Sequence, residues 1–171
     1  MPNPTYTLIS SNTLGSAAAS VSFTSIPNIY TNLIIRCSAR RSASGLTDLT
    51  FYLNSDSATN AYTYMQSSGS AATGGNVTSS SIKSLNTVPS TAETANTFGS
   101  IEINIPFKNS TPANSVGVFG VGENNGATGY VNNAAGLRVT GTGTISSVTI
   151  SPGTGSFDTG SSFYIYGLTT A

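Results

Sequence analysis

Charged and catalytic side chains are scarce in this sequence of 171 residues. It contains no histidine, no tryptophan and one cysteine, and charged residues make up 7% of it, against about 25% in an ordinary soluble domain. Without histidine, neither a Ser-His-Asp triad nor a Cys-His pair can be assembled, and the commonest zinc ligand is missing. The sequence therefore predicts a protein that is not an enzyme and that requires no cofactor.

The few charges that exist balance each other. Six basic and six acidic residues give a formal net charge of zero. A neutral chain creates no sustained field that attracts nucleic acid or an anionic membrane, so neither partner is expected. No apolar run approaches the roughly 18 residues of a membrane span, and the first residues show no secretory leader pattern. We therefore expect synthesis in the cytoplasm and no membrane-spanning segment.

The acidic residues show no spacing typical of a catalytic pair. A glycosidase needs two carboxylates that flank the sugar, whereas the acids here are scattered over turns and strand edges. The segments around Asp56 and Glu123 offer oxygen ligands for calcium, but neither has the regular acidic spacing of an EF-hand loop. Solvated or ion-paired carboxylates are the favoured interpretation, so no metal ligand is predicted.

Apolar and polar residues alternate with a period of two along most of the chain. In DLTFYLN, for example, Leu49, Phe51 and Leu53 fall on one side of an extended strand. About ten such segments are separated by turns rich in Gly, Pro, Asn and Ser, and no window carries a convincing helical stripe. The sequence predicts an all-β fold, a single antiparallel β-sandwich of jelly-roll-like form that spans residues 1–171.

The alternation also predicts strand positions and buried side chains. The first strand is expected near residues 5–10 and the last near 162–168, while the Ser- and Gly-rich stretch 67–81 is expected to be a long surface loop. Cys37 lies in the apolar run LIIRCSA, which favours a small core residue over a reactive thiol. The predicted core consists of Val21, Phe23, Leu33, Ile35, Leu49, Phe51, Leu53, Ile101, Ile103, Phe163 and Ile165.

Three of the six basic residues, Arg36, Arg40 and Arg41, fall within six positions. If residues 32–40 form a strand, Arg36 and Arg40 share its outward face, and Arg36 can pair with Glu102 on another strand. Alternatively, Arg40 and Arg41 reach a carboxylate of another chain, which arginine binds bidentately. Arg40 and Arg41 are therefore possible interface residues. Reversing both charges should weaken assembly and leave the thermal midpoint nearly unchanged.

Two segments near the ends of the chain resemble a known group of proteins. SIPNIYTNLIIRCSARR and SSFYIYGL are similar to the opening and closing strands of small virion structural proteins of tailed bacteriophages, notably those of cyanophages. In such proteins these strands bracket a β-sandwich. The resemblance implies a capsid decoration (cement) protein, a head fibre or a tail appendage, and it does not separate these roles.

A capsid decoration protein on the outer surface of the assembled head is the preferred function. Such a protein needs a stable sandwich and an interface, but no catalytic equipment. The role implies the major capsid protein as partner, a homotrimer as oligomer and the virion as location. The alternative is a fibre module that recognises host surface carbohydrate, with Tyr62 and Tyr64 stacked on sugar rings. Against it stand the absence of tryptophan and the frequency of tyrosine in cores and on sheets.

Overall fold

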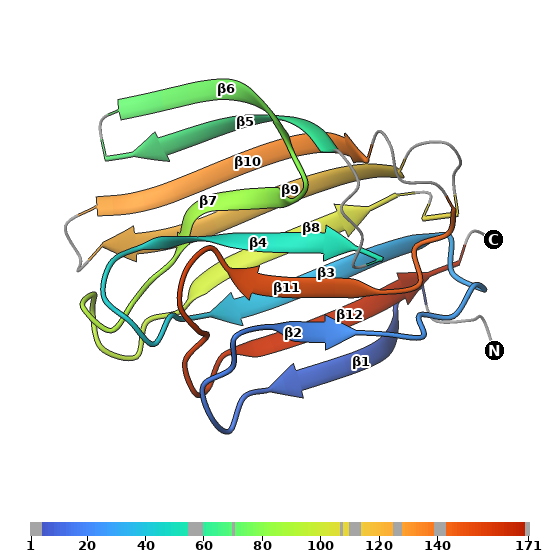
Figure 1. Ribbon diagram of the computed structural model, residues 1–171, viewed down its shortest axis with the longest axis horizontal. Helices are drawn as coiled ribbons and strands as arrows, with labels where there is room; N and C mark the ends of the chain where they lie inside the picture. Colours follow the sequence, from blue (N-terminus) through green and yellow to red (C-terminus); the bar gives the residue numbers. More distant parts are fainter. Residues whose placement is uncertain are drawn as a thin grey trace.

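The protein folds as a β-sandwich. The computed structural model describes residues 5–54, 60–69, 71–106, 108–109, 114–124, 128–138 and 143–169. Within these ranges the chain forms twelve β-strands and no helix, and thus no helix that could cross a membrane. All the strand pairs are antiparallel, and the strands make two sheets that pack face to face (Figure 1). The predicted all-β antiparallel sandwich is confirmed.

The two sheets differ in size, with eight strands in one and four in the other. The larger sheet has the order β1-β12-β3-β8-β9-β10-β5-β6, and the smaller has the order β2-β11-β4-β7. In chain order the strands are β1 Thr7–Thr13, β2 Val21–Phe23, β3 Asn32–Ala39, β4 Thr47–Leu53, β5 Asn60–Ser68, β6 Ala71–Ser79, β7 Ile82–Val88, β8 Gly99–Ile105, β9 Asn114–Asn124, β10 Thr128–Arg138, β11 Val148–Pro152 and β12 Ser162–Leu168.

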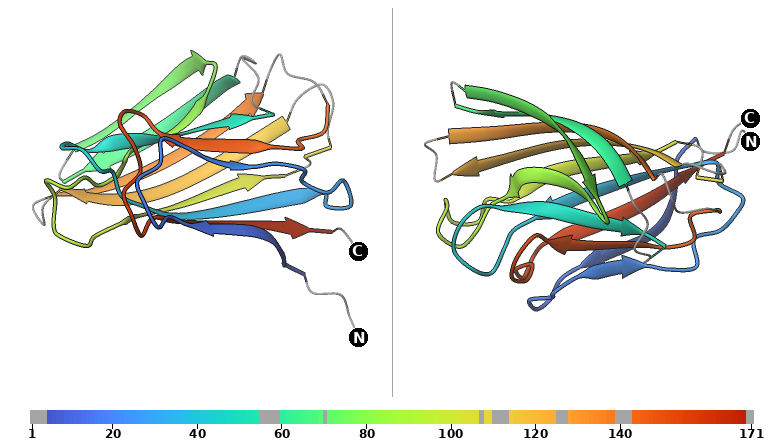
Figure 2. Two further views of the ribbon diagram at one scale, coloured as in Figure 1. Left: turned by 60° about the horizontal axis from the view of Figure 1, so that its bottom comes forward. Right: turned by 45° about the horizontal axis from the view of Figure 1, so that its top comes forward.

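The chain passes from one sheet to the other several times, and its first and last strands lie side by side. Strands β1 to β4 alternate between the larger and the smaller sheet, and the chain returns at its end so that β11 pairs with β2 and β12 pairs with β1. Figures 1 and 2 show this return as blue strands lying beside red ones. The first two strands of the chain thus pair with the last two, one pair in each sheet.

The core lies between the sheets and is built from alternate residues of the strands. All eleven side chains predicted to be buried are at most 5% exposed, and Cys37 is buried among them. Phe157 and Phe163 add an aromatic contact with ring centroids 4.8 Å apart. Full burial of a side chain such as Phe51 contributes about 2 to 3 kcal/mol by the hydrophobic effect, so this layer supplies most of the stability.

The prediction of a long surface loop at residues 67–81 is wrong. The stretch contains the end of β5, a turn at Gly69 and the whole of β6, which pairs with β5 through nine consecutive residue pairs. The first strand also differs from its predicted position, since β1 runs from Thr7 to Thr13, whereas β12 coincides with the predicted last strand.

Strand β7 is a second element that the alternation did not predict. It packs closely on β9, because two glycines of β9 leave room for it. A Cβ at Gly120 would overlap Ser84 Oγ, and a Cβ at Gly122 would lie 3.0 Å from the Asn86 carbonyl oxygen. The smaller sheet therefore reaches across the inner face of β9, and the strands β5 and β6 extend beyond it (Figure 1).

Candidate binding face

One face of the eight-stranded sheet points away from the smaller sheet, and we call it the open face. It carries the residues that alternate with the buried ones along each strand. The register aligns them in rows across the sheet, so that Arg36 on β3 lies opposite Glu102 on β8, and Glu102 lies opposite Phe119 on β9. The open face comprises Leu8, Ile34, Arg36, Thr63, Met65, Asn76, Thr78, Glu102, Asn104, Phe119, Val121, Val131, Ala135, Tyr164 and Tyr166.

Four large side chains form an exposed apolar cluster on the open face. Met65 is 69% exposed and Phe119 is 48% exposed, and both line the same hollow of the surface. Val121 and Val131 are also exposed, and the register places them directly opposite each other on β9 and β10. Exposed apolar side chains that lie singly are normal, but a contiguous group marks a contact surface.

The other end of the open face has a smaller apolar group. Tyr6, which precedes β1, and Leu8 on β1 are both more than half exposed, and Tyr6 lines a hollow with Ile34 and Tyr166. Among the described residues, Ile29 is the single large apolar side chain that is exposed elsewhere, in the loop before β3. The exposed apolar surface of the described residues is therefore concentrated on this one face.

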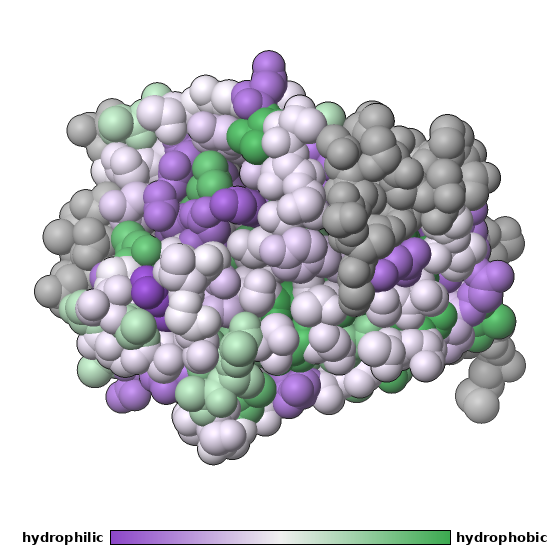
Figure 3. All heavy atoms as spheres, viewed as in Figure 1, coloured by the Kyte–Doolittle hydropathy of each residue, from purple (hydrophilic) through white to green (hydrophobic). Residues whose placement is uncertain are grey.

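The outer face of the smaller sheet is different in character. It presents Ser22, Tyr52, Lys83 and Thr149, with the hydroxyls of Ser22 and Thr149 2.9 Å apart. Figure 3 shows the molecule in the same view as Figure 1. On this face pale colours dominate and hydrophobic residues are scattered. The two outer faces of the sandwich thus differ, and only the open face has a large apolar cluster among its described residues.

An ion pair lies in the middle of the open face. Arg36 Nη2 is 2.6 Å from Glu102 Oε2, and Asn104 Nδ2 donates to Glu102 Oε1 at 2.9 Å. The predicted pairing of Arg36 with Glu102 is confirmed. The Arg36 side chain is 66% exposed, so the pair contributes less than about 1 kcal/mol to stability, but it neutralises both charges on the face.

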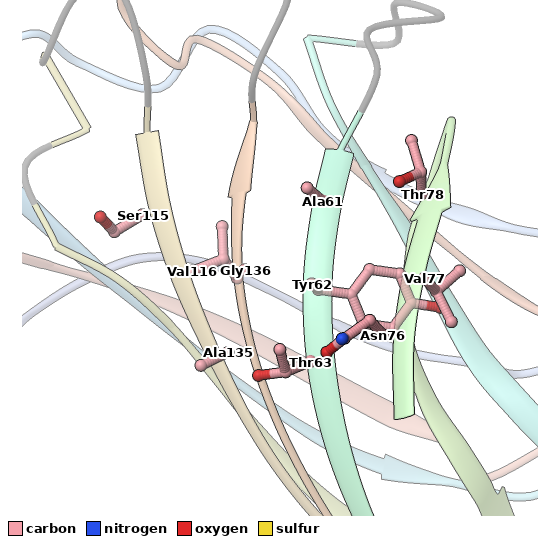
Figure 4. Close-up of a pocket in the computed structure, with 10 residues that line it drawn as sticks. All are labelled: Ala61, Tyr62, Thr63, Asn76, Val77, Thr78, Ser115, Val116, Ala135 and Gly136. Carbon is pink, nitrogen blue, oxygen red and sulfur yellow. The ribbon is translucent and has the colours of Figure 1, made fainter. Parts of the chain in front are cut away.

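A groove runs across β9, β10, β5 and β6 on the open face (Figure 4). Its volume is about 620 Å³, and its rim carries the hydroxyl and amide groups of Thr63, Asn76, Thr78 and Ser115. The floor of the groove is formed by the small side chain of Ala135 and by the backbone of its neighbours, so no large side chain fills it. Among the described residues that line it, none carries a carboxylate, ammonium or guanidinium group.

The groove continues into a second hollow. This hollow has a volume of about 420 Å³, shares Thr63 and Ala135 with the groove, and ends at Met65 and Phe119 of the apolar cluster. The groove and the cluster thus form one continuous depression in which uncharged polar groups stand next to apolar ones.

Arg40 does not have the position that the strand pattern predicted. Strand β3 ends at Ala39, and the Arg40 side chain turns inward, where it is 6% exposed. Its Nη1 donates to the carbonyl oxygens of Thr94 and Thr97, each at 2.8 Å, and its Nε lies 3.9 Å from Asp158 Oδ2. The expectation that Arg40 faces outward on strand β3 is wrong, because the carbonyl groups of the 90–98 loop bind it within the fold, and its role at an interface stays a prediction.

Arg41 lies nearby and is half-buried. Its backbone N–H donates to the Pro89 carbonyl at 2.7 Å, and its Nη1 donates to the Gly45 carbonyl at 2.9 Å. Its guanidinium group also lies against Gly155, whose φ of 76° is one that glycine readily adopts. Arg41 thus joins two turns at one end of the sandwich, and its role at an interface stays a prediction.

The two tyrosines proposed for sugar stacking point away from the open face. Tyr62 is 4% exposed, lies beside Gly136 and extends towards Val77 of β6 (Figure 4). Burial, together with the charge of Asp48, raises the pKa of its phenol. Tyr64 is half-buried, and its ring covers Gly75. Tyr62 therefore cannot stack on a sugar in this structure, since its ring belongs to the core.

The acidic residues within the described ranges all have partners in the fold, and Asp56 lies outside these ranges. No group of three or more His, Cys, Asp or Glu residues that could hold a metal ion occurs in the described part of the chain. The partners are Lys83 for Asp48, the Ser90 backbone N–H for Glu93, Arg36 for Glu102, the Thr94 and Thr97 hydroxyls for Glu123, and Arg40 for Asp158.

Lys108 is a buried polar residue that the sequence did not indicate. It is fully buried, and its Nζ lies 3.0 Å from Asn109 Oδ1 and 3.5 Å from both Asn28 Oδ1 and the Ile145 carbonyl. Burial lowers the pKa of Lys108. In the sequence it stands in the turn-like context FKNSTP, which is typical of an exposed lysine.

Comparison with known proteins adds no relationship: no family model, curated protein or solved structure matches this chain.

Proposed function

We propose that this protein is a non-enzymatic structural protein of a virion that binds a protein surface through its open face. The preferred role is that of a capsid decoration protein on the major capsid protein. The observation that carries the proposal is the concentration of exposed large apolar side chains on one face of the sandwich. The resemblance of the end segments to phage virion proteins supports the choice of partner.

The size of the open face suits a protein partner. Eight strands spaced by about 4.8 Å make a sheet roughly 34 Å wide, and about seven residues at 3.3 Å each give a length near 23 Å. The resulting flat area is on the order of 800 Å², which is what a standard protein interface covers on each partner. Aromatic and Met side chains, here Phe119 and Met65, are enriched at the centres of such interfaces.

The test compares two charge substitutions at exposed apolar positions. Phe119→Asp changes the open face, and Ile29→Asp changes an exposed side chain away from it. Both sites are solvated, so neither variant should lower the thermal midpoint by more than a few degrees. Each variant is produced in cells that assemble the virus, and its amount relative to the major capsid protein is measured in purified particles by quantitative mass spectrometry.

We expect the wild type and Ile29→Asp to be retained at equimolar abundance or a simple fraction of it, and Phe119→Asp to be depleted at least tenfold. Equal retention of both variants would exclude the open face as the attachment surface. Wild-type protein that is absent from purified particles would refute the virion role itself.

The uncharged groove favours a second candidate function, that of a fibre module which binds a neutral host glycan. Hydroxyl and amide groups on the rim, such as those of Thr63 and Asn76, match the hydrogen-bonding needs of sugars, and Phe119 offers a flat apolar ring at the end of the depression. Ala135→Phe fills the floor. Neutral oligosaccharides that shift the NMR signals of the wild type but not of this variant would favour the second function.

A further inference from the structure

The four edge strands of the sandwich are not equally protected against pairing with another chain. An edge strand presents unpaired backbone N–H and C=O groups, and proteins normally protect it by short length, a bulge, a charge or a proline. The edges are β1 and β6 in the larger sheet and β2 and β7 in the smaller one. Within the part of the chain that the structure describes, only β6 lacks all of these protections.

Three of the edges have recognisable protection. Strand β2 is three residues long. Strand β1 has a register shift between Leu8 and Ser10 in its pairing with β12. Strand β7 carries Lys83, and its pairing with β4 has a register shift between Thr47 and Leu49. Each of these features makes a continuous added strand unfavourable.

Strand β6 has the opposite properties. Its sequence AATGGNVTS contains no charged residue and no proline, and it pairs with β5 over nine residues without a shift in register. Every one of its residues is exposed or half-buried, and it lies at the free upper border of the sheet in Figure 1. Gly74 and Gly75 place no side chain of their own in the middle of the strand, where the Tyr64 ring covers Gly75 on one face only, so a second backbone can approach the edge.

We propose that β6 pairs with β6 of a second copy of this chain and joins two eight-stranded sheets into one. Two properties favour a second copy as the partner of this edge. The strand is neutral, so two identical edges do not repel each other. An antiparallel pair of identical strands is also self-complementary about a two-fold axis. With all nine residues paired, the axis passes through Gly75. This inference does not depend on the proposed function.

The pairing predicts an even-numbered assembly. A two-fold contact through β6 gives a dimer, whereas the decoration role led us to expect a trimer. Sedimentation equilibrium on the full chain over a range of concentrations distinguishes these states. Hydrogen exchange measured by mass spectrometry on the same samples shows whether the amides of residues 71–79 become protected as the concentration rises.

The variant that tests the contact is N76K combined with T78K. Both side chains are exposed, so the fold tolerates them, and the two copies would place four lysines near one axis. The matched control is N12K on the β1 edge, where the side chain is also exposed. Circular dichroism and the thermal midpoint check that each variant is folded.

We expect a dimer for the wild type and for N12K, protection of 71–79 that increases with concentration by at least tenfold in exchange rate, and a monomer for the β6 double variant. A wild-type monomer at all concentrations overturns the proposal, as does an oligomer that survives the double variant. Protection of β6 that arises only when virus particles are added also overturns it, because the added strand would then come from another protein.

Discussion

The buried guanidinium of Arg40 leads to a sharp prediction about stability. In Arg40→Met the stem of the side chain is retained and the donors are lost. Two hydrogen bonds from a charged group to carbonyl oxygens disappear, those to Thr94 and Thr97, and each is worth about 1.5 to 3 kcal/mol. The ion pair with Asp158, at 3.9 Å and partly solvated, adds less than about 1 kcal/mol.

The sum of these terms is an upper bound, because water can reach the carbonyl groups of the exposed turn when the arginine is gone. We therefore expect the free energy of unfolding to fall by about 3 kcal/mol. In a domain of this size each kcal/mol shifts the thermal midpoint by about 2 to 4 °C, so the midpoint should fall by roughly 6 to 12 °C. Such a fall would argue against the sequence-based expectation that reversing the charges of Arg40 and Arg41 together leaves the thermal midpoint nearly unchanged.

Arg36→Met is the matched control, since it is the same substitution at an arginine that is 66% exposed. It should cost less than about 1 kcal/mol. Both variants and the wild type are compared by urea denaturation followed by tyrosine fluorescence, with circular dichroism at 218 nm as a second probe. If Arg40→Met and Arg36→Met unfold at the same urea concentration, the guanidinium of Arg40 does not stabilise the 90–98 loop.

Further predictions concern two glycines and the single thiol. Gly99→Ala should destabilise the protein by about 3 kcal/mol or more, because a Cβ there overlaps the Thr87 carbonyl, whereas Gly117→Ala should stay within about 0.5 kcal/mol of the wild type. Equal thermal midpoints for Gly99→Ala and Gly117→Ala would contradict the predicted overlap at Gly99. Burial raises the pKa of the Cys37 thiol, so it should resist iodoacetamide at pH 8 until urea unfolds the chain. Because the unfolded thiol ionises above about pH 8.5 and the folded one does not, stability should decline from that pH upwards, and less so in Cys37→Ala.

The strands that were predicted correctly are those in which large apolar residues mark one side. Leu49, Phe51 and Leu53 define β4 without any help from the rest of the fold, and the same holds for Phe163 and Ile165 in β12. In these segments the burial of alternate side chains is strong enough to set both the strand and its facing.

The strands that were missed depend on their neighbours. In β6 a single large apolar residue, Val77, packs against the core, and the strand exists because β5 offers it a complete set of hydrogen bonds. In β7 the buried face includes the small polar residue Ser84, which fits only because Gly120 on β9 lies beneath it. Such matches between distant segments leave no periodic signal in the sequence.

The candidate site was only partly predictable for a similar reason. The pairing of Arg36 with Glu102 followed from two adjacent outward positions on regular strands. The burial of Arg40 depends on the path of the 90–98 loop, and the burial of Tyr62 depends on Gly136 beside it. The open face itself could not be recognised, because the sequence does not show which outward side chains lie together.

The difference in strand number between the two sheets has a consequence for how this protein can evolve. The hairpin of β5 and β6 lies at the border of the larger sheet, where the ladder between β5 and β10, the buried Tyr62 ring and a hydrogen bond from Gln66 to the Leu85 carbonyl of β7 join it to the sandwich. A hairpin at the border of a sheet can change in sequence at its outward positions, provided that Tyr62 stays in the core. Since the hairpin supplies Met65, Thr63 and Asn76 to the open face, changing these side chains would create a new binding specificity on an old scaffold.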